Sequence, residues 1–235
     1  MFNFAETGIP ATEPLKKPRI SVNKLAEYIE ASVARRKTIV QSAKYPPKVT
    51  TTRYSIAREV AIEYLSKRNE QVLADEIELL NHADVSTEFK KNDVANSISV
   101  LQLIQQMELP ELENIETGPW RGGNPLIRIS GVDISVNPDL FLAGTVRGKK
   151  QIGVLKLSII KTNPLSAYGQ GIVALLAKDF INVAMPEDAG IINKRLCLSF
   201  DAFQQRIISC PDAEVARRKE VEAACMEISH WWGNL

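Results

Sequence analysis

Three runs of β-forming residues follow one another in the middle of the chain, and they restrict the folds that it can adopt. The runs span residues 126–136, 140–146 and 151–160, with Asn137-Pro138 and Arg147-Gly148 between them. Connections this short join antiparallel neighbours, because a parallel connection needs a dozen residues or more. The sequence therefore predicts a three-stranded antiparallel meander.

Helical patterns lie on both sides of this meander, and one further strand is expected near the end of the chain. Apolar residues recur at intervals of three and four in the expected helices, whereas the added strand is a short apolar run. The helices are expected at about 21–43, 52–68, 70–82, 87–106, 163–183 and 212–232, and the strand at about 196–200. A helical crossover from the third strand to the fourth gives a mixed sheet. We therefore expect an α+β or α/β fold, with a helical region followed by a mixed four-stranded sheet flanked by helices.

Proline and glycine divide the chain into four parts. Residues 1–19 hold three prolines and no apolar period, which predicts an extended, flexible arm. Residues 20–109 form the helical region. Three prolines and three glycines in residues 110–125 predict a connector without regular structure. The remaining residues, 126–235, are expected to form the α/β domain.

Composition narrows the setting in which the protein works. The 235 residues are 45% hydrophobic and 24% charged, which is typical of a globular protein that needs no disulfide or metal to hold its core. No apolar run approaches the roughly 20 residues that a bilayer-spanning helix needs, so we expect no membrane insertion. The three cysteines show no CxxC spacing, and the first residues lack a basic segment followed by an apolar one. These features favour a reducing, cytoplasmic location and no structural zinc site.

Charge is distributed unevenly, although the net charge is only +1. Residues 16–48 carry nine basic against two acidic residues, and residues 59–116 carry thirteen acidic against four basic ones. A basic surface next to an acidic one is one arrangement that binds nucleic acid, but a solvated acidic helix face explains the pattern as well. The candidate phosphate-contacting residues in the first basic segment are Arg35, Arg36, Lys37 and Lys44.

Two charged residues interrupt the apolar meander. Asp139 stands at the mouth of the second run, and Lys156 lies in the third run between Leu155 and Leu157. Side chains alternate along a strand, so Lys156 faces the other way from both leucines. Such a lysine either belongs to a functional site or is an edge residue that reaches solvent and blocks strand pairing.

The Pro138-Asp139 pair, the lysine on the next run and the order of strands and helix resemble the core of the PD-(D/E)XK nuclease superfamily. The resemblance covers about 110 residues of the chain. It implies that Asp139 binds Mg²⁺, and that Lys156 is catalytic and orients the attacking water or stabilises the charged transition state. It also implies hydrolysis of phosphodiester bonds in DNA or RNA.

The chain departs from the superfamily pattern at the second acid. That acid lies two residues before the lysine, where this chain has Val154. Asp133, in the first run, is the best candidate for a second catalytic carboxylate. Acids on neighbouring helices are the alternatives: Glu59, Glu63 and Asp179. Gln170 lies on the expected crossover helix, where RecB-like nucleases often keep a glutamine, and Lys161 follows the third run as a further phosphate-contacting candidate.

The leading hypothesis is therefore a Mg²⁺-dependent nuclease-fold protein that acts on DNA or RNA. The alternatives are a catalytically inactive nucleic-acid-binding or assembly subunit, and a protein–protein interaction module or homo-oligomer that docks through amphipathic helices and Trp231-Trp232. The resemblance also suggests prokaryotic mobile-element or antiviral systems, an analogy at the level of the fold alone.

Overall fold

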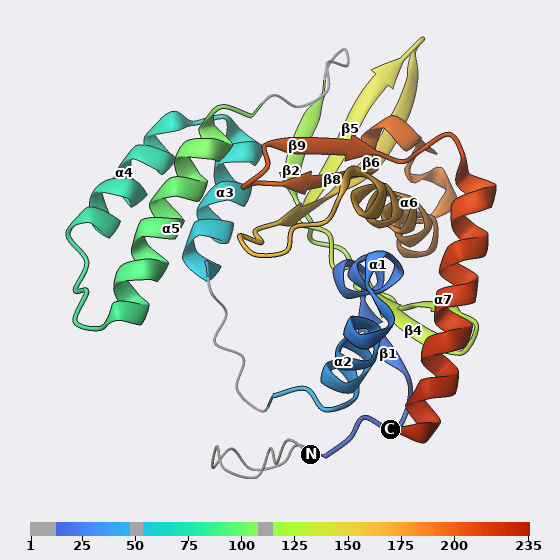
Figure 1. Ribbon diagram of the computed structural model, residues 1–235. Coiled ribbons are helices and arrows are strands. Elements are labelled where there is room, and N and C mark those ends of the chain that lie inside the picture. The colour runs from blue at the N-terminus through green and yellow to red at the C-terminus, as the bar shows by residue number, and fades with distance from the viewer. Residues whose placement is uncertain (1–12, 48–53, 108–114) are drawn as a thin grey trace.

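A mixed sheet of six strands lies at the centre of the molecule, so the expectation of four strands is wrong (Figure 1). The computed structural model describes residues 13–47, 54–107 and 115–235. Five strands follow the order β2-β5-β6-β8-β9, and β7 pairs with β6 beside β8. The strands are β2 (Glu116–Pro119), β5 (Leu140–Val146), β6 (Lys149–Ser158), β7 (Ile191–Ile192), β8 (Leu198–Asp201) and β9 (Arg206–Ser209).

Strand directions in this sheet follow from the lengths of the connections. β5 and β6 are joined by a two-residue turn and pair antiparallel, with Leu140 opposite Leu155. β6 and β8 pair parallel, and the long helix α6 (Ala167–Ala184) lies between them in the chain. The expected antiparallel hairpin and the helical crossover to a parallel strand are therefore both present.

The first strand of the meander is not the one that the sequence predicts. On the side away from β6, the partner of β5 is β2, which lies inside the expected connector. The run at 126–136 instead forms a separate hairpin of β3 (Ile127–Ile129) and β4 (Val132–Ser135). This run is not one strand because Ser130 and Gly131 both have positive φ, at 46° and 84°, and reverse the chain within two residues.

A second, three-stranded sheet is made from this hairpin and from the expected arm. Its order is β1-β4-β3, and β1 (Arg19–Ser21) runs parallel to β4. The backbone N–H of Leu15 donates to the carbonyl of Lys44 at 2.9 Å, so the arm is tied down in this region. Residues 1–12 of the expected arm and 110–114 of the expected connector lie outside the described residues.

The helices agree with the apolar periodicity, with one exception. The single helix expected at 21–43 is two helices, α1 (Val22–Glu30) and α2 (Val33–Lys44), because Ala31 and Ser32 take extended backbone angles. The next three helices begin and end within a few residues of the expected positions. They are α3 (Ser55–Lys67), α4 (Glu70–Asn81) and α5 (Glu88–Gln105), and α7 (Glu214–Asn234) is likewise close to its expected position.

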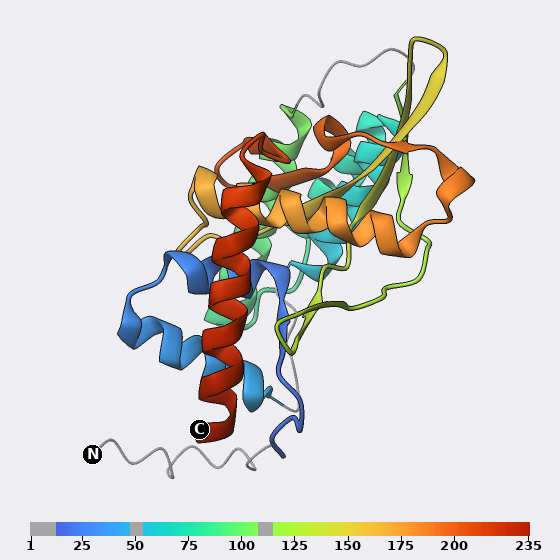
Figure 2. The same ribbon diagram turned by 90° about the vertical axis from the view of Figure 1, so that its right-hand side faces the viewer.

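The helical half of the chain is divided between the two faces of the central sheet (Figures 1 and 2). Helices α3, α4 and α5 cover the face that carries Leu155, Leu157 and Phe200. The opposite face, which carries Ile152 and Val154, is covered by α6, with α1, α2 and α7 packed around it. Among the helices that the structure describes, none combines the length and the apolar character needed to cross a bilayer.

Helix α6 is buried almost all round, as its apolar sequence predicts. Its N-terminus is capped from two sides. Ser166 accepts hydrogen bonds from the backbone N–H groups of Tyr168 and Gly169, and Glu30 of α1 accepts from Gly169 at 2.8 Å. A side chain at position 169 would meet the Glu30 carboxylate at 2.8–2.9 Å, so the glycine permits this approach. The carboxylate complements the positive end of the helix dipole.

A second glycine sets the spacing between β6 and the chain that crosses it. A Cβ at Gly153 would overlap the backbone carbonyl and the Cβ of Leu196, the last residue of the short 3-10 helix η3 (Lys194–Leu196). These atoms of Leu196 are held in place, since the residue is fully buried and its N–H donates to the carbonyl of Asn193. The close approach of two backbones therefore requires glycine at this position.

Candidate functional site

Asp139 and Lys156 lie side by side at one end of the β5–β6 hairpin. The strand register pairs Leu140 with Leu155, so extending it by one residue places Asp139 opposite Lys156. Asp139 is only 8% exposed, and its Oδ2 lies 3.4 Å from the Lys156 Nζ. The structure thus brings together the two residues that carry the nuclease resemblance.

A third residue, Arg58 of α3, completes this cluster and was not identified from the sequence. Its Nε donates to Asp139 Oδ1 at 2.8 Å and its Nη2 to Oδ2 at 2.9 Å, which is the bidentate geometry of a strong arginine–carboxylate pair. The Leu157 N–H also donates to Oδ2, at 2.7 Å. Both oxygens of the buried carboxylate are therefore engaged by the protein itself.

Lys156 is held inside the structure and is largely shielded from solvent. Its side chain is 12% exposed, and β6 pairs with β5 on one side and β8 on the other, so the interpretation as an edge lysine is wrong. The Nζ donates to the carbonyl of Asn137 at 2.6 Å. Burial lowers the pKa of Lys156, and the charge of Arg58 lowers it further, whereas Asp139 opposes both. One acid and two bases give the cluster a net positive charge.

This donor set does not fit a Mg²⁺ site. The cation prefers several oxygen ligands, commonly carboxylates and water. Asp139 offers a single carboxylate whose oxygens already accept hydrogen bonds from Arg58 and Leu157, and two cationic groups stand beside it. Val154 is fully buried in the core on the face covered by α6. Across residues 13–47, 54–107 and 115–235, no group of three or more His, Cys, Asp or Glu could hold a metal.

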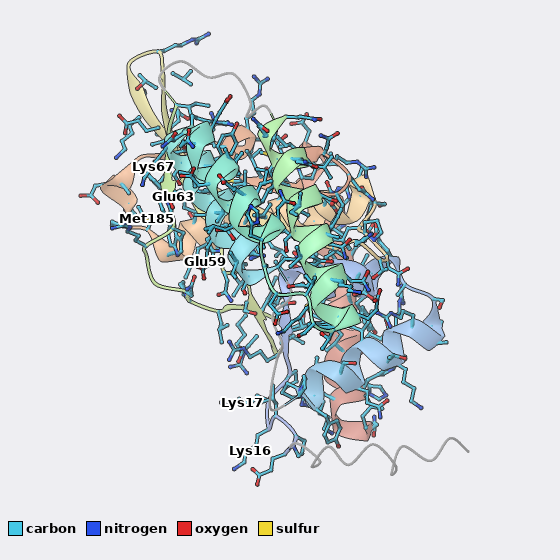
Figure 3. The ribbon with its side chains drawn as sticks, turned by 90° about the vertical axis from the view of Figure 1, so that its left-hand side faces the viewer. Lys16, Lys17, Glu59, Glu63, Lys67 and Met185 are labelled. Atoms are coloured by element: carbon cyan, nitrogen blue, oxygen red, sulfur yellow. The ribbon has the colours of Figure 1, made fainter. Side chains whose placement is uncertain are left out.

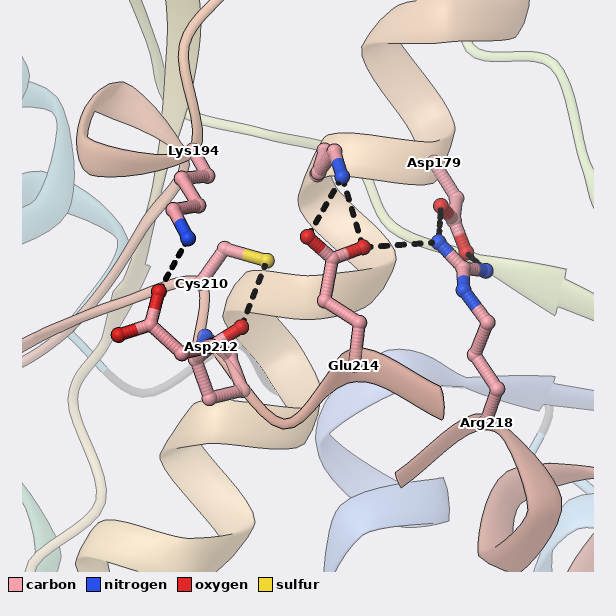
Figure 4. A network of polar contacts seen from close by, with 8 residues as sticks. Asp179, Lys194, Cys210, Asp212, Glu214 and Arg218 are labelled. Carbon is pink, nitrogen blue, oxygen red and sulfur yellow. Dashed lines mark hydrogen bonds and ion pairs between the residues drawn. The ribbon is translucent and has the colours of Figure 1, made fainter. Parts of the chain in front are cut away.

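The other candidate acids lie elsewhere. Asp133 is on β4 in the second sheet, 3.9 Å from the Arg128 Nε, so the main sheet does not carry it as a second carboxylate. Glu59 and Glu63 are exposed on the outer side of α3 (Figure 3). Asp179 pairs with Arg218 of α7 (Figure 4). None of these acids shares a hydrogen bond or ion pair with Asp139 or Lys156 in the described part of the chain.

The basic residues expected to contact phosphate fall into two groups. Three of them serve the packing of helices: Arg35 donates to Glu27, Arg36 donates to the carbonyls of Tyr28 and Ile29 and to Glu227, and Lys44 donates to the carbonyl of Trp232. The other two, Lys37 and Lys161, are exposed. Lys37 lines a shallow surface pocket beside α7, and Lys161 donates to Asn96 Oδ1 at 2.6 Å. Arg35 is also exposed, with 45% of its side chain accessible, but its guanidinium is paired with Glu27.

Polar side chains continue under α6 next to the cluster. Ser158 follows Lys156 on the same face of β6, and Asp201 of β8 is its cross-strand neighbour. Gln170 of α6 is 1% exposed, and neither its side-chain amide nor the Ser158 hydroxyl makes a hydrogen bond with the described residues. Burial raises the pKa of Asp201, whose Oδ1 accepts a hydrogen bond from the Gln204 N–H.

The Asp201→Asn variant is expected to become more stable relative to the parent protein as pH rises from 4 to 7. The folded protein holds the Asp201 proton above the ordinary carboxyl pKa, so in this range the native state binds more protons than the unfolded state and stability falls with pH. Asparagine removes that fall because it does not ionise. Urea unfolding of both proteins at pH 4 and pH 7 measures the difference, and an equal difference at the two pH values would contradict the assignment.

A second polar network, which does not include Asp139, joins α6 to α7 and to η3 (Figure 4). Lys178 donates to both oxygens of Glu214 at 2.7 Å, Arg218 pairs with Asp179, and Lys194 pairs with Asp212. Each acid in it has a cationic partner, and Lys178 lowers the pKa of Glu214 through its hydrogen bond. This network therefore serves the packing of the two helices.

The three cysteines are buried, and they are unsuited to catalysis. Burial raises the pKa of Cys197 to about 12, of Cys210 to about 11 and of Cys225 to about 12. A thiol with such a pKa is almost entirely protonated near neutral pH, and the thiolate is the nucleophilic form. These residues act as small core side chains.

The Arg58–Asp139–Lys156 cluster is thus the arrangement that best combines buried charge with a functional geometry. Arg58 was not predicted because it lies 81 residues from Asp139 in the sequence, and nothing in its local pattern marks it as a partner of that carboxylate. The sequence holds one signal for such a residue. An acid that is expected among apolar neighbours, with a single lysine to pair with, needs a second cation. No protein-family model matches this chain, and no curated protein matches it either.

Proposed function

We propose that this chain is a nuclease-like protein that has lost catalysis and binds nucleic acid without cutting it. The observation that carries the proposal is the bidentate pairing of Arg58 with both oxygens of Asp139. The order of strands around the cluster supports the nuclease-like core, since an antiparallel hairpin is followed by a helical crossover to a parallel strand.

The absence of cutting follows from the chemistry of the cluster. A guanidinium keeps its positive charge at all accessible pH values, so Arg58 does not release the Asp139 carboxylate by losing a proton. A Mg²⁺ ion would have to displace both of its hydrogen bonds as well as the Leu157 N–H. It would also have to bind beside Lys156 without a second carboxylate. The proposed role is therefore binding alone.

Phosphate binding at this end of the sheet is supported by the cations that the cluster leaves accessible. The Arg58 side chain is 32% exposed, and its Nη1 makes no hydrogen bond with any residue that the structure describes. Lys161 is exposed shortly beyond the end of β6. Arginine and lysine N–H groups are the usual partners of phosphate oxygens in nucleic acids.

Two measurements test the proposal on the purified full chain. Plasmid, linear DNA and RNA are expected to stay intact in Mg²⁺ or Mn²⁺. Fluorescence anisotropy is expected to show salt-dependent binding to an oligonucleotide, and Lys161→Gln is expected to reduce the slope of log K against log salt by about one. Lys37→Gln is the matched control, because it removes another exposed lysine far along the chain and should leave the slope unchanged.

The outcomes separate the alternatives. Metal-dependent cleavage that disappears in Asp139→Ala would show an active nuclease and overturn the proposal. Absence of any binding to DNA or RNA would favour a protein assembly role instead. A slope that falls equally in the Lys37 and Lys161 variants would indicate a diffuse charge effect with no defined site.

A further inference from the structure

The hairpin of β5 and β6 extends beyond the sheet as a two-stranded ribbon (Figures 1 and 2). β2 pairs with β5 only as far as Ala143, and β7 pairs with β6 only at Gln151 and Ile152. Beyond these positions the two strands pair with each other alone, out to Val146 opposite Lys149. Among the described residues, no other strand pairs with the tip.

Three basic side chains crowd this tip. Arg147, Lys149 and Lys150 are all exposed, and no acid lies in residues 140–158 of the hairpin. None of the three side chains makes an ion pair or a side-chain hydrogen bond with a described residue. By contrast, Arg36, Arg58 and Arg218 are each paired with an acid. Within the described residues, no ion pair compensates the three positive charges of the tip.

The turn itself indicates that the arginine serves a purpose other than folding. Arg147 and Gly148 have φ of 50° and 74°, so both central residues of the two-residue turn lie in the left-handed region. Asparagine or aspartate followed by glycine is the usual solution for such a turn, because these residues accept positive φ more readily than arginine does. Strained residues of this kind concentrate at functional positions.

We propose that the hairpin tip inserts into the major groove of duplex DNA, with Arg147, Lys149 and Lys150 contacting phosphates and base edges. A two-stranded β-ribbon fits the major groove of B-form DNA, which is about 12 Å wide, whereas the major groove of A-form RNA is too narrow for side chains to read. The tip is the far end of the hairpin from Asp139, with seven residues of β5 between them. The inference extends the proposed nucleic-acid binding to a second contact, and it stands on different residues.

Variants of the tip test this with a built-in control for folding. Arg147→Asn removes the charge but suits the turn better, so it is expected to keep or raise the melting temperature while DNA binding weakens. Lys149→Gln/Lys150→Gln is expected to lower the slope of log K against log salt by about two for a 20-base-pair duplex. Lys16→Gln/Lys17→Gln removes the same charge from exposed positions at the opposite end of the molecule and should leave the slope unchanged (Figure 3).

Each outcome supports or overturns the proposed contact between the hairpin tip and DNA. Tip variants that bind duplex DNA with the parent slope and affinity would overturn the inference, and so would equal losses in the Lys16/Lys17 control. Unchanged DNA binding with lost binding to phosphatidylserine vesicles would assign the tip to a membrane surface and overturn it as well. A parent protein that cleaves DNA, with weaker binding in the tip variants, would overturn the proposed loss of catalysis and support the tip contact.

Discussion

Asp139→Ala is expected to lower the free energy of unfolding by about 3–5 kcal/mol, the range seen when one partner of a buried ion pair is removed. The substitution leaves Lys156 and Arg58 next to each other with no acid between them. It also leaves the Leu157 N–H without its acceptor inside the protein. Urea unfolding monitored by circular dichroism measures the loss.

Asp133→Ala is the matched control for this experiment. It removes the same side chain from the same region of the sequence, but Asp133 is paired only loosely with Arg128, whose side chain is largely exposed. Exposed pairs contribute about 0–1 kcal/mol, so the variant should unfold close to the parent. Equal losses in the two variants would show that Asp139 makes no special contribution to stability.

The sign of the Asp139 effect also bears on function. Catalytic groups often destabilise the folded protein, so their removal leaves the stability unchanged or raises it. A carboxylate that neutralises two adjacent cations, Arg58 and Lys156, has the opposite effect. An Asp139→Ala protein as stable as its parent would therefore contradict the structural role of the cluster and favour an active site.

Gly153→Ala is expected to lower the free energy of unfolding by about 3 kcal/mol, at the upper end of the range for overpacked sites. The added methyl would overlap the backbone of Leu196, which belongs to another segment and is fully buried. Backbone atoms cannot move aside as the end of a flexible side chain can, so either β6 or the η3 segment must shift. Urea unfolding again gives the measurement.

Gly118→Ala provides the control, because it is also a strand glycine. A Cβ at Gly118 would have no atom within 4 Å, and its backbone is not in the left-handed region. The variant is expected to keep the parent stability to within about 1 kcal/mol, since alanine only restricts the unfolded chain. If Gly153→Ala proved equally harmless, the close approach of β6 and Leu196 would not exist in solution.

Local patterns explain why much of the fold could be predicted from the sequence. Apolar periodicity is a property of neighbouring residues, so the helices α4, α5 and α6 and the hairpin of β5 and β6 lie near their expected positions. Pairing across the sheet is not local. The sequence does not distinguish β2 from the run at 126–136 as the partner of β5, because that choice depends on how α3 packs against the edge of the sheet.

The candidate site, too, could be predicted from the sequence only in part. Asp139 and Lys156 are close because a two-residue turn joins their strands, and this neighbourhood follows from the hairpin alone. Arg58 reaches the cluster only because α3 lies across the sheet, which no spacing in the sequence reveals. The intramolecular partners of the candidate phosphate contacts Arg36 and Lys44 could not be predicted for a related reason, since Glu227 and Trp232 lie at the other end of the chain.

Those last contacts have a consequence for how the chain is made. Trp232 donates to the carbonyl of Leu15 and accepts from Lys44, so α1 and α2 share one layer with α7. Most of the chain must be synthesised before this layer can close, because α7 follows all the other helices. Contacts between such distant segments form slowly, and the apolar side of α1 stays uncovered on the ribosome until first α6 and then α7 have been made. The emerging chain therefore carries an exposed hydrophobic segment through most of its translation, which makes it a natural substrate for chaperones.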